Sequence, residues 1–306
     1  MAIAVDQARP SRPLDRLADH LPKLVLAPSF LVTLFFVYGF ILWTTYLSFT
    51  KSRFMPVMAL DGLRPYERLW ANPNWWTSLE NLFIFSVLYI GLATFLGMLL
   101  AILLDQRIRA EGVLRTIYLY PMAISFIVTG TAWKWLLNPG IGIEKIVRDW
   151  GFESFSFDWI TQPGTAIYCI VLAAIWQSSG FVMAMFLAGL RGVDNEIVKA
   201  AQIDGASTFQ IYRRIIIPLM RPVFLSSFVI LAHLAIKSYD LIVALTDGGP
   251  GTSTWLPAVF MYKMTFTRNE VALGAASAVM MLLTVAAIMV PYLYSELRQS
   301  GRGGHG

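Results

Sequence analysis

The chain is poor in cysteine, histidine and charge. Cys169 is the only cysteine and lies in an apolar run, which excludes a disulfide framework and a multi-cysteine metal site. The three histidines are scattered, and none forms a His-x-x-x-His pair, so no metal site is expected. Charged residues make up only 14% of the sequence, against 57% hydrophobic residues. A soluble domain could not bury that much apolar surface, so the composition predicts an integral membrane protein.

Patterns of catalysis and nucleotide binding are also missing. The sequence has no Gly-rich loop that ends in Gly-Lys-Ser or Gly-Lys-Thr, and no nucleophile elbow. We therefore predict that the chain is not an enzyme and holds no cofactor of its own. The net charge of +5 does not indicate a nucleic-acid partner, because most basic residues lie beside apolar runs, where they signal membrane topology.

Long apolar runs are what the sequence has in abundance. After a polar tail at residues 1–23, the first run covers 24–49 and exceeds the roughly 7 to 15 residues of a signal-peptide core. Five further runs have about the 20 residues that a bilayer requires. They cover 81–104, 115–137, 166–190, 223–245 and 273–295, and a second polar tail follows at 297–306. The sequence predicts an all-α membrane protein with six transmembrane helices.

The distribution of Lys and Arg predicts the orientation. If the N-terminus lies inside, the cytoplasmic segments carry more basic residues than the external ones. The positive-inside rule then places both termini in the cytoplasm, together with the segment between the fourth and fifth runs.

That segment, residues 195–218, is called the elbow here. Asp194 or Asn195 can cap a short helix whose apolar side holds Ile197, Val198, Ala200 and Ala201, and Gly205 supplies a left-handed residue to end it. Ser207 and Gln210 have the spacing of a capping box that starts a second helix, until Pro218 interferes with regular hydrogen bonding. A short amphipathic helix suits a groove in a partner protein. An interfacial loop that only joins two spans fits the same spacing.

The elbow resembles the EAA loop of permease subunits in binding-protein-dependent ABC importers. The shared order is Ala-Ala, three residues, Gly, nine residues, Ile, one residue, an aliphatic residue and Pro, although Lys199 stands where that family usually has Glu. The resemblance implies a cytoplasmic coupling helix docked in a cleft of an ATP-hydrolysing subunit. The coupling residues would be Lys199, Ala200, Ala201, Asp204, Gly205, Ala206, Ile215 and Pro218.

Two turn-rich segments extend the resemblance. Asn138 to Gly142 is similar to an Asn-Pro-x-x-Gly signature of these permeases. Tyr239 to Thr254 is similar to Tyr-Asp-x-x-x-x-Leu-Thr-x-Gly-Gly-Pro-x-x-x-Thr, a signature of their carbohydrate-uptake branch. The resemblance implies a type I ABC importer permease fold with its core at residues 80–296, in the bacterial cytoplasmic (inner) membrane.

The resemblance also implies partners. These would be a second homologous permease subunit, a dimer of ATP-binding subunits that holds ATP and Mg, a periplasmic or external solute-binding protein, a sugar and membrane lipid. The chain itself would form half of the translocation pathway.

Polar residues inside the apolar runs are candidates for the solute path. Sugars stack on aromatic rings and need amide or hydroxyl partners, which favours Trp176, Gln177 and Tyr239, with Asp240 beside them. Lys237 and Asp240 lie three residues apart, on one face of the expected fifth helix. They could instead be a self-neutralising structural pair, or the relay of a secondary transporter driven by an ion gradient. A cytoplasmic docking helix favours the ATP-driven importer, because a secondary carrier needs none.

Overall fold

The structure is a computed structural model that describes residues 23, 25–106 and 109–302. The predicted tail at 1–23 lies almost wholly outside this range, as do the last four residues of the tail at 297–306. Within the described ranges every regular element is a helix and no strand forms, and the β-bridge between Thr50 and Leu60 is isolated. The expected all-α architecture is confirmed.

Four helices of the described chain are long and apolar enough to cross a membrane, and up to six spans result if each of two bent helix pairs counts as one. The first span, Val25–Leu47, includes a π-helical turn, η1 (Leu34–Tyr38), and α2 (Gly39–Leu47). The others are α4 (Pro73–Asp105), α8 (Ala166–Arg191) and α15 (Val271–Arg302). These helices correspond to four of the predicted runs.

The prediction of one continuous third span over 115–137 was wrong. The segment consists of α5 (Glu111–Ala123) and α6 (Phe126–Leu136), which meet at 99°. Pro121 lies in the last turn of α5, Ile124 is extended, and the Ser125 side chain caps α6. The Gln177 amide of α8 donates to the Ile124 carbonyl at 2.7 Å, so a backbone group exposed by the break is satisfied inside the protein.

The fifth span over 223–245 is not continuous either. Helix α12 (Arg221–Ile236) ends before Lys237, and α13 (Asp240–Thr246) starts after two more residues and packs against α6. No Pro or Gly marks this break, so the apolar run conceals it. Lys237 and Asp240 therefore do not share one helix face as expected.

Helices α4 and α8 pack against each other at the centre of the bundle. Phe85, Tyr89, Ala93, Gly97 and Ala101 recur every four residues along α4, and all are buried. A Cβ atom on Gly97 would lie 2.6 Å from a methyl carbon of Val182 on α8. Such close approach lets dispersion contacts hold helices together where lipid provides no hydrophobic driving force.

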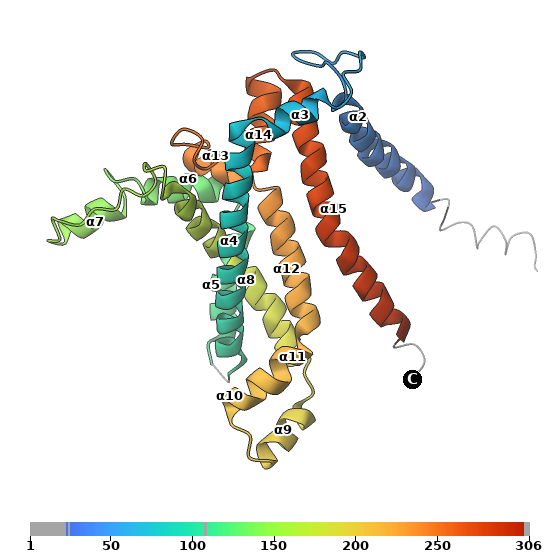
Figure 1. Cartoon of the computed structure of the whole chain (residues 1–306). Coiled ribbons are helices and arrows are strands. Elements are labelled where there is room, and N and C mark those ends of the chain that lie inside the picture. The colour runs from blue at the N-terminus through green and yellow to red at the C-terminus, as the bar shows by residue number, and fades with distance from the viewer. Residues whose placement is uncertain (1–22, 24, 107–108, 303–306) are drawn as a thin grey trace, which may run out of the picture.

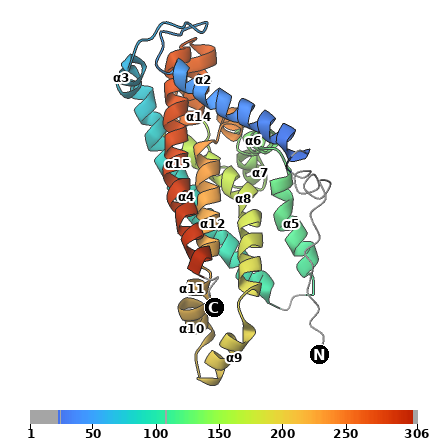
Figure 2. The same ribbon diagram turned by 90° about the vertical axis from the view of Figure 1, so that its right-hand side faces the viewer.

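The elements gather at two ends of the molecule (Figure 1). The elbow helices lie at one end, the end toward which α15 runs, and α3 and α14 lie at the other. The N-terminal span contacts α15 and leans out from the bundle in Figure 1. Figure 2, seen from that side, shows the span running obliquely across the front of the bundle. The remaining short elements are α3 (Arg64–Trp70), α7 (Ile143–Asp149), α9 (Asn195–Ile203), α10 (Thr208–Ile211), η2 (Tyr212–Ile216), α11 (Ile217–Leu219), α14 (Pro257–Tyr262) and η3 (Lys263–Thr267).

Candidate functional sites: an exposed elbow and a polar cavity

The elbow is built by its local sequence. The Asp194 carboxylate accepts from the Glu196 N–H at 2.9 Å and caps α9. At the other end, the Ala206 N–H bonds the Ala201 carbonyl at 3.0 Å and the Gly205 N–H bonds the Gln202 carbonyl at 3.1 Å, which is a Schellman motif. Gly205 has φ +80°, as the sequence predicts. The chain therefore reverses sharply after α9.

The second half of the elbow begins with the expected capping box. The Ser207 hydroxyl and the Gln210 side chain each accept from the other residue's backbone N–H. The helix then widens into the π-helical turn η2 just before Pro218, which has no N–H to donate. A 65° bend between α11 and α12 turns the chain into the bundle.

Helix α9 has two apolar faces, whereas the sequence analysis placed its apolar residues on one. Val198 and Ala201 face the bundle, and Ala201 is buried. Ile197, Ala200 and Ile203, spaced by three, are exposed, and Ile203 is 86% exposed. The outward face is therefore apolar although nothing in the described chain covers it.

Phe209 extends this outward apolar face. It lies in the first turn of α10, and it is 71% exposed. Ile197, Ile203 and Phe209 are together called the elbow patch. Sequence reasoning missed Ile203, although its three-residue spacing from Ala200 was a usable signal.

The predicted coupling residues divide into two groups. Lys199, Ala200, Asp204 and Gly205 are exposed, and neither Lys199 nor Asp204 forms an ion pair with another described residue. The others are buried or half-buried and attach the elbow to the bundle: Ala201, Ala206, Ile215 and Pro218.

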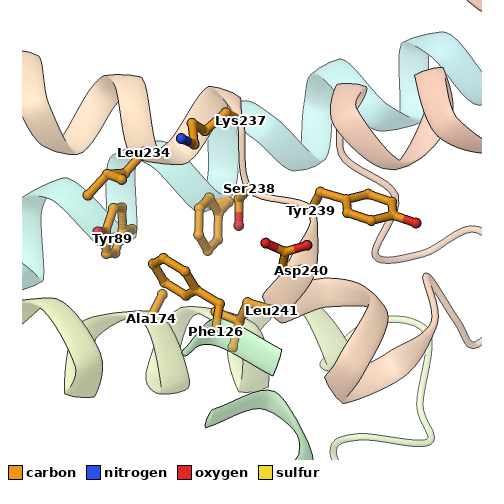
Figure 3. A pocket seen from close by; sticks show the side chains of 10 residues that line it. Tyr89, Phe126, Ala174, Leu234, Lys237, Ser238, Tyr239, Asp240 and Leu241 are labelled. Atoms are coloured by element: carbon orange, nitrogen blue, oxygen red, sulfur yellow. The ribbon is translucent and has the colours of Figure 1, made fainter. Parts of the chain in front are cut away.

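A small polar cavity lies where α12 breaks (Figure 3). Its volume is about 40 Å³, and α4, α6, α8, α12 and α13 contribute to its wall. Asp240 directs its carboxylate into the cavity beside the Ser238 hydroxyl, whereas the Tyr239 ring points away. The Tyr239 ring contacts the ring of Tyr262 in a tilted arrangement, with 4.8 Å between the ring centroids. The lining residues are Phe85, Tyr89, Phe126, Ala174, Leu234, Lys237, Ser238, Tyr239, Asp240 and Leu241.

The structure does not support a self-neutralising Lys237–Asp240 pair. Within the described chain neither side chain has an oppositely charged partner within 4.0 Å, and both are exposed. The helix break separates them, because it ends the regular geometry that would place residues three apart on one face. Two charges thus lie unpaired beside the cavity.

Two other solute-path candidates lie elsewhere on α8. Gln177 is buried and holds the α5–α6 break, and its side-chain oxygen has no partner among the described residues. Trp176 is half-exposed and meets Trp133 edge to face at 6.0 Å. The structure thus brings Tyr239 and Asp240 to the cavity, whereas Trp176 and Gln177 do not line it.

The Gly-rich signature after Tyr239 forms a fixed loop at the opposite end from the elbow. The Thr246 and Thr254 hydroxyls bond each other at 2.9 Å, and the Gly248 N–H donates to Thr246 Oγ1 at 3.2 Å. The Asn81 amide of α4 donates to the carbonyls of Ser253 and Trp255, at 2.9 and 3.0 Å. Asn81 therefore ties the loop to the centre of the bundle.

Together, the broken apolar helices, the elbow and the polar cavity define a multi-pass membrane transport protein with the type I ABC importer permease fold. The chain belongs to the family of binding-protein-dependent transport system inner membrane components, whose family profile matches residues 93–299. Accordingly, it is a membrane component of a transport system and not an enzyme.

Relatives support this assignment over nearly the whole chain. A probable ABC transporter permease protein of Pyrococcus horikoshii is 42% identical over 91% of this chain and 97% of its own length. The xylose/arabinose import permease protein of Haloferax volcanii is 34% identical over 87% of this chain and 84% of its own. The same fold occurs in the crystal structure of a bacterial ABC transporter involved in the import of the acidic polysaccharide alginate. That structure has a TM-score of 0.80 and 19% identity, over 93% of this chain and 97% of the other.

Proposed function

We propose that this chain is the transmembrane permease subunit of an ATP-driven sugar importer and couples to a separate ATPase through the elbow. The observation that carries the proposal is the elbow patch. Its apolar side chains are exposed in the described chain, and the elbow helices that carry them lie at one end of the bundle (Figure 1). Exposed apolar clusters of this kind mark protein interaction sites, and a helix that presents Ile197 and Ile203 fits a hydrophobic groove.

The ATPase partner supplies the chemistry that this chain lacks. ATP and Mg would be bound by a dimer of ATP-binding subunits, and closure of that dimer would displace the elbow. A rigid-body change of this type switches a transporter between two openings.

A second, homologous permease subunit would complete the pathway. Helix α12 has 16 residues, or about 24 Å of length from Arg221 to its end. Lys237 and Asp240 therefore lie within the roughly 30 Å hydrocarbon layer if α12 starts at the cytoplasmic surface. Charges within the hydrocarbon layer face an aqueous cavity or a partner. The exposed side of the segment that carries Lys237 and Asp240 would therefore face the second permease subunit.

The chemistry of the cavity supports a sugar as the substrate, and the family supports an external solute-binding protein as a partner. The cavity combines aromatic rings with hydroxyl and carboxylate groups, a combination that suits a carbohydrate. The family is binding-protein-dependent, and one relative is an import permease for xylose and arabinose. The exposed elbow patch favours the ATP-driven importer over the ion-gradient alternative, because a secondary carrier needs no cytoplasmic docking surface.

The proposed location is the cytoplasmic membrane, with both termini and the elbow in the cytoplasm. The end of the molecule that carries the elbow also holds the basic residues Arg213, Arg214 and Arg221. The positive-inside rule favours the cytoplasm for that end, and lipid would contact the outward faces of the bundle.

The test is purification of the tagged protein from its own cells in mild detergent, with co-purifying chains identified by mass spectrometry. Wild type should recover an ATPase, a second permease and, in part, the binding protein. Ile203→Glu and Gly205→Arg should lose the ATPase and keep the second permease. Phe54→Glu, which introduces the same charge at another exposed apolar residue away from the elbow, is the control. A chain recovered alone or only with copies of itself would overturn the proposal.

A further inference from the structure

A cluster of three charged side chains joins three helices at the base of the elbow. Arg191, the last residue of α8, donates from Nη2 to Glu111 Oε1 at 2.6 Å. Its Nε lies 3.7 Å from Asp105 Oδ1. Glu111 is the first residue of α5 and Asp105 is the last residue of α4. One guanidinium therefore connects the ends of α4, α5 and α8.

The helix dipoles explain why the charges stand in these places. A carboxylate at the start of α5 and a guanidinium at the end of α8 are each favoured by the dipole of their own helix. Asp105, at the end of α4, is disfavoured by its dipole, and Arg191 provides the compensating charge. The three side chains are 32–45% exposed. Solvent-screened pairs of this kind add little to folding stability, so their position at the elbow suggests a role in geometry.

Helices α5 and α8 meet at two further points along their length. A Cβ atom on Gly180 would lie 1.8 Å from the Tyr118 carbonyl oxygen, so the two backbones touch. Nearer the cavity, Gln177 holds the carbonyl of Ile124. Only Gly192 to Asp194 separate α8 from α9. Helix α5 is therefore attached at its base, middle and end to the helix that leads into the elbow.

We propose that Arg191 is a positioning residue that clamps α5 to α8, so that displacement of the elbow is passed to α5. Beyond the break at Ile124, α6 then carries Phe126 into the cavity wall. The clamp makes the cytoplasmic ends of α5 and α8 move as one body with α9. This inference rests on the proposed function, because the displacement is assigned to a partner ATPase.

Spin-label distance measurements in the purified native complex test the clamp. In a Cys169→Ser background, one label pair joins α5 to α9 (Thr116→Cys with Glu196→Cys). A reference pair joins α9 to α15 (Glu196→Cys with Leu283→Cys). Each is measured without nucleotide and with ATP plus orthovanadate. We expect a narrow α5–α9 distance that is the same in both states, and a reference distance that shifts.

Variants of the cluster separate the clamp from general packing. Arg191→Gln should broaden the distribution of α5–α9 spin-label distances both without and with nucleotide. Arg191→Lys, which keeps the positive charge, should leave this distribution narrow. In an Asp105→Asn background, Arg191→Glu should broaden it, and adding Glu111→Arg should make it narrow again. A distribution unchanged by Arg191→Gln, or an α5–α9 distance that shifts in wild type, would overturn the clamp. If no ATPase co-purifies, or nucleotide shifts neither pair, the proposed function itself fails.

Discussion

Gly205 and Gly180 show two different physical reasons why a position requires glycine. Gly205 has open space where a Cβ atom would lie, but its φ of +80° disfavours any side chain. Gly180 lies within a regular helix, but its missing Cβ leaves room for the backbone of α5. The first requirement is local and readable from the turn pattern. The second depends on a neighbouring helix and is invisible in the sequence.

Gly180→Ala should destabilise the bundle by about 1–3 kcal/mol, because α5 must move to admit the methyl group. Gly91→Ala on α4 is the matched control, since nothing lies within 4 Å of that site. It should be neutral or stabilising by up to about 1 kcal/mol, as expected for helix propensity. Thermal unfolding in detergent, followed by circular dichroism, measures both. Equal effects would contradict the close α5–α8 contact.

At the scale of elements, the two broken spans have different origins. The α5–α6 break has a local marker in Pro121, and Gln177 stabilises it from another helix. The α12–α13 break has no Pro or Gly, and α13 is held by its packing on α6. An apolar run indicates membrane residence but does not fix helix direction, because lipid-facing and buried residues are equally apolar.

The Gly-rich loop is an element whose order depends on one residue of α4. Asn81→Ala removes two hydrogen bonds, each with a net contribution of about 0.5–1.5 kcal/mol. Amide hydrogen exchange over residues 247–256 should therefore accelerate roughly tenfold. Thr77→Ala, whose hydroxyl bonds only its own helix, should leave exchange unchanged. Equal exchange in both variants would show that the loop is ordered without Asn81.

For the whole molecule, the unpaired charges of Lys237 and Asp240 predict that water reaches the cavity. A second subunit would be needed to complete this aqueous path. In the Cys169→Ser background, Asp240→Cys should react with a membrane-impermeant thiol reagent. Leu241→Cys, whose native side chain is 1% exposed, should not react. Addition of the reagent to right-side-out and inside-out vesicles also tests orientation, since Ile203→Cys should react only in the latter. Equal, slow labelling of residues 240 and 241 would contradict a water-filled cavity.

The class of protein and the local geometry of the elbow could be predicted from the amino-acid sequence. Composition alone requires a membrane environment, and the caps, the Gly205 turn and the capping box arise from hydrogen bonds between residues only a few positions apart. Those interactions can be predicted from a short stretch of sequence, because both partners lie within it. The elbow was therefore predicted nearly residue by residue, except for the outward direction of Ile203 and Phe209.

Contacts between distant segments set the α12–α13 break, the separation of Lys237 from Asp240 and the role of Gln177 at the α5–α6 break. Tertiary structure also assembles the Arg191 cluster from residues of three helices. Each depends on contacts between segments far apart in the chain, where the energy of packing and of satisfied backbone groups outweighs the local preference for a continuous helix.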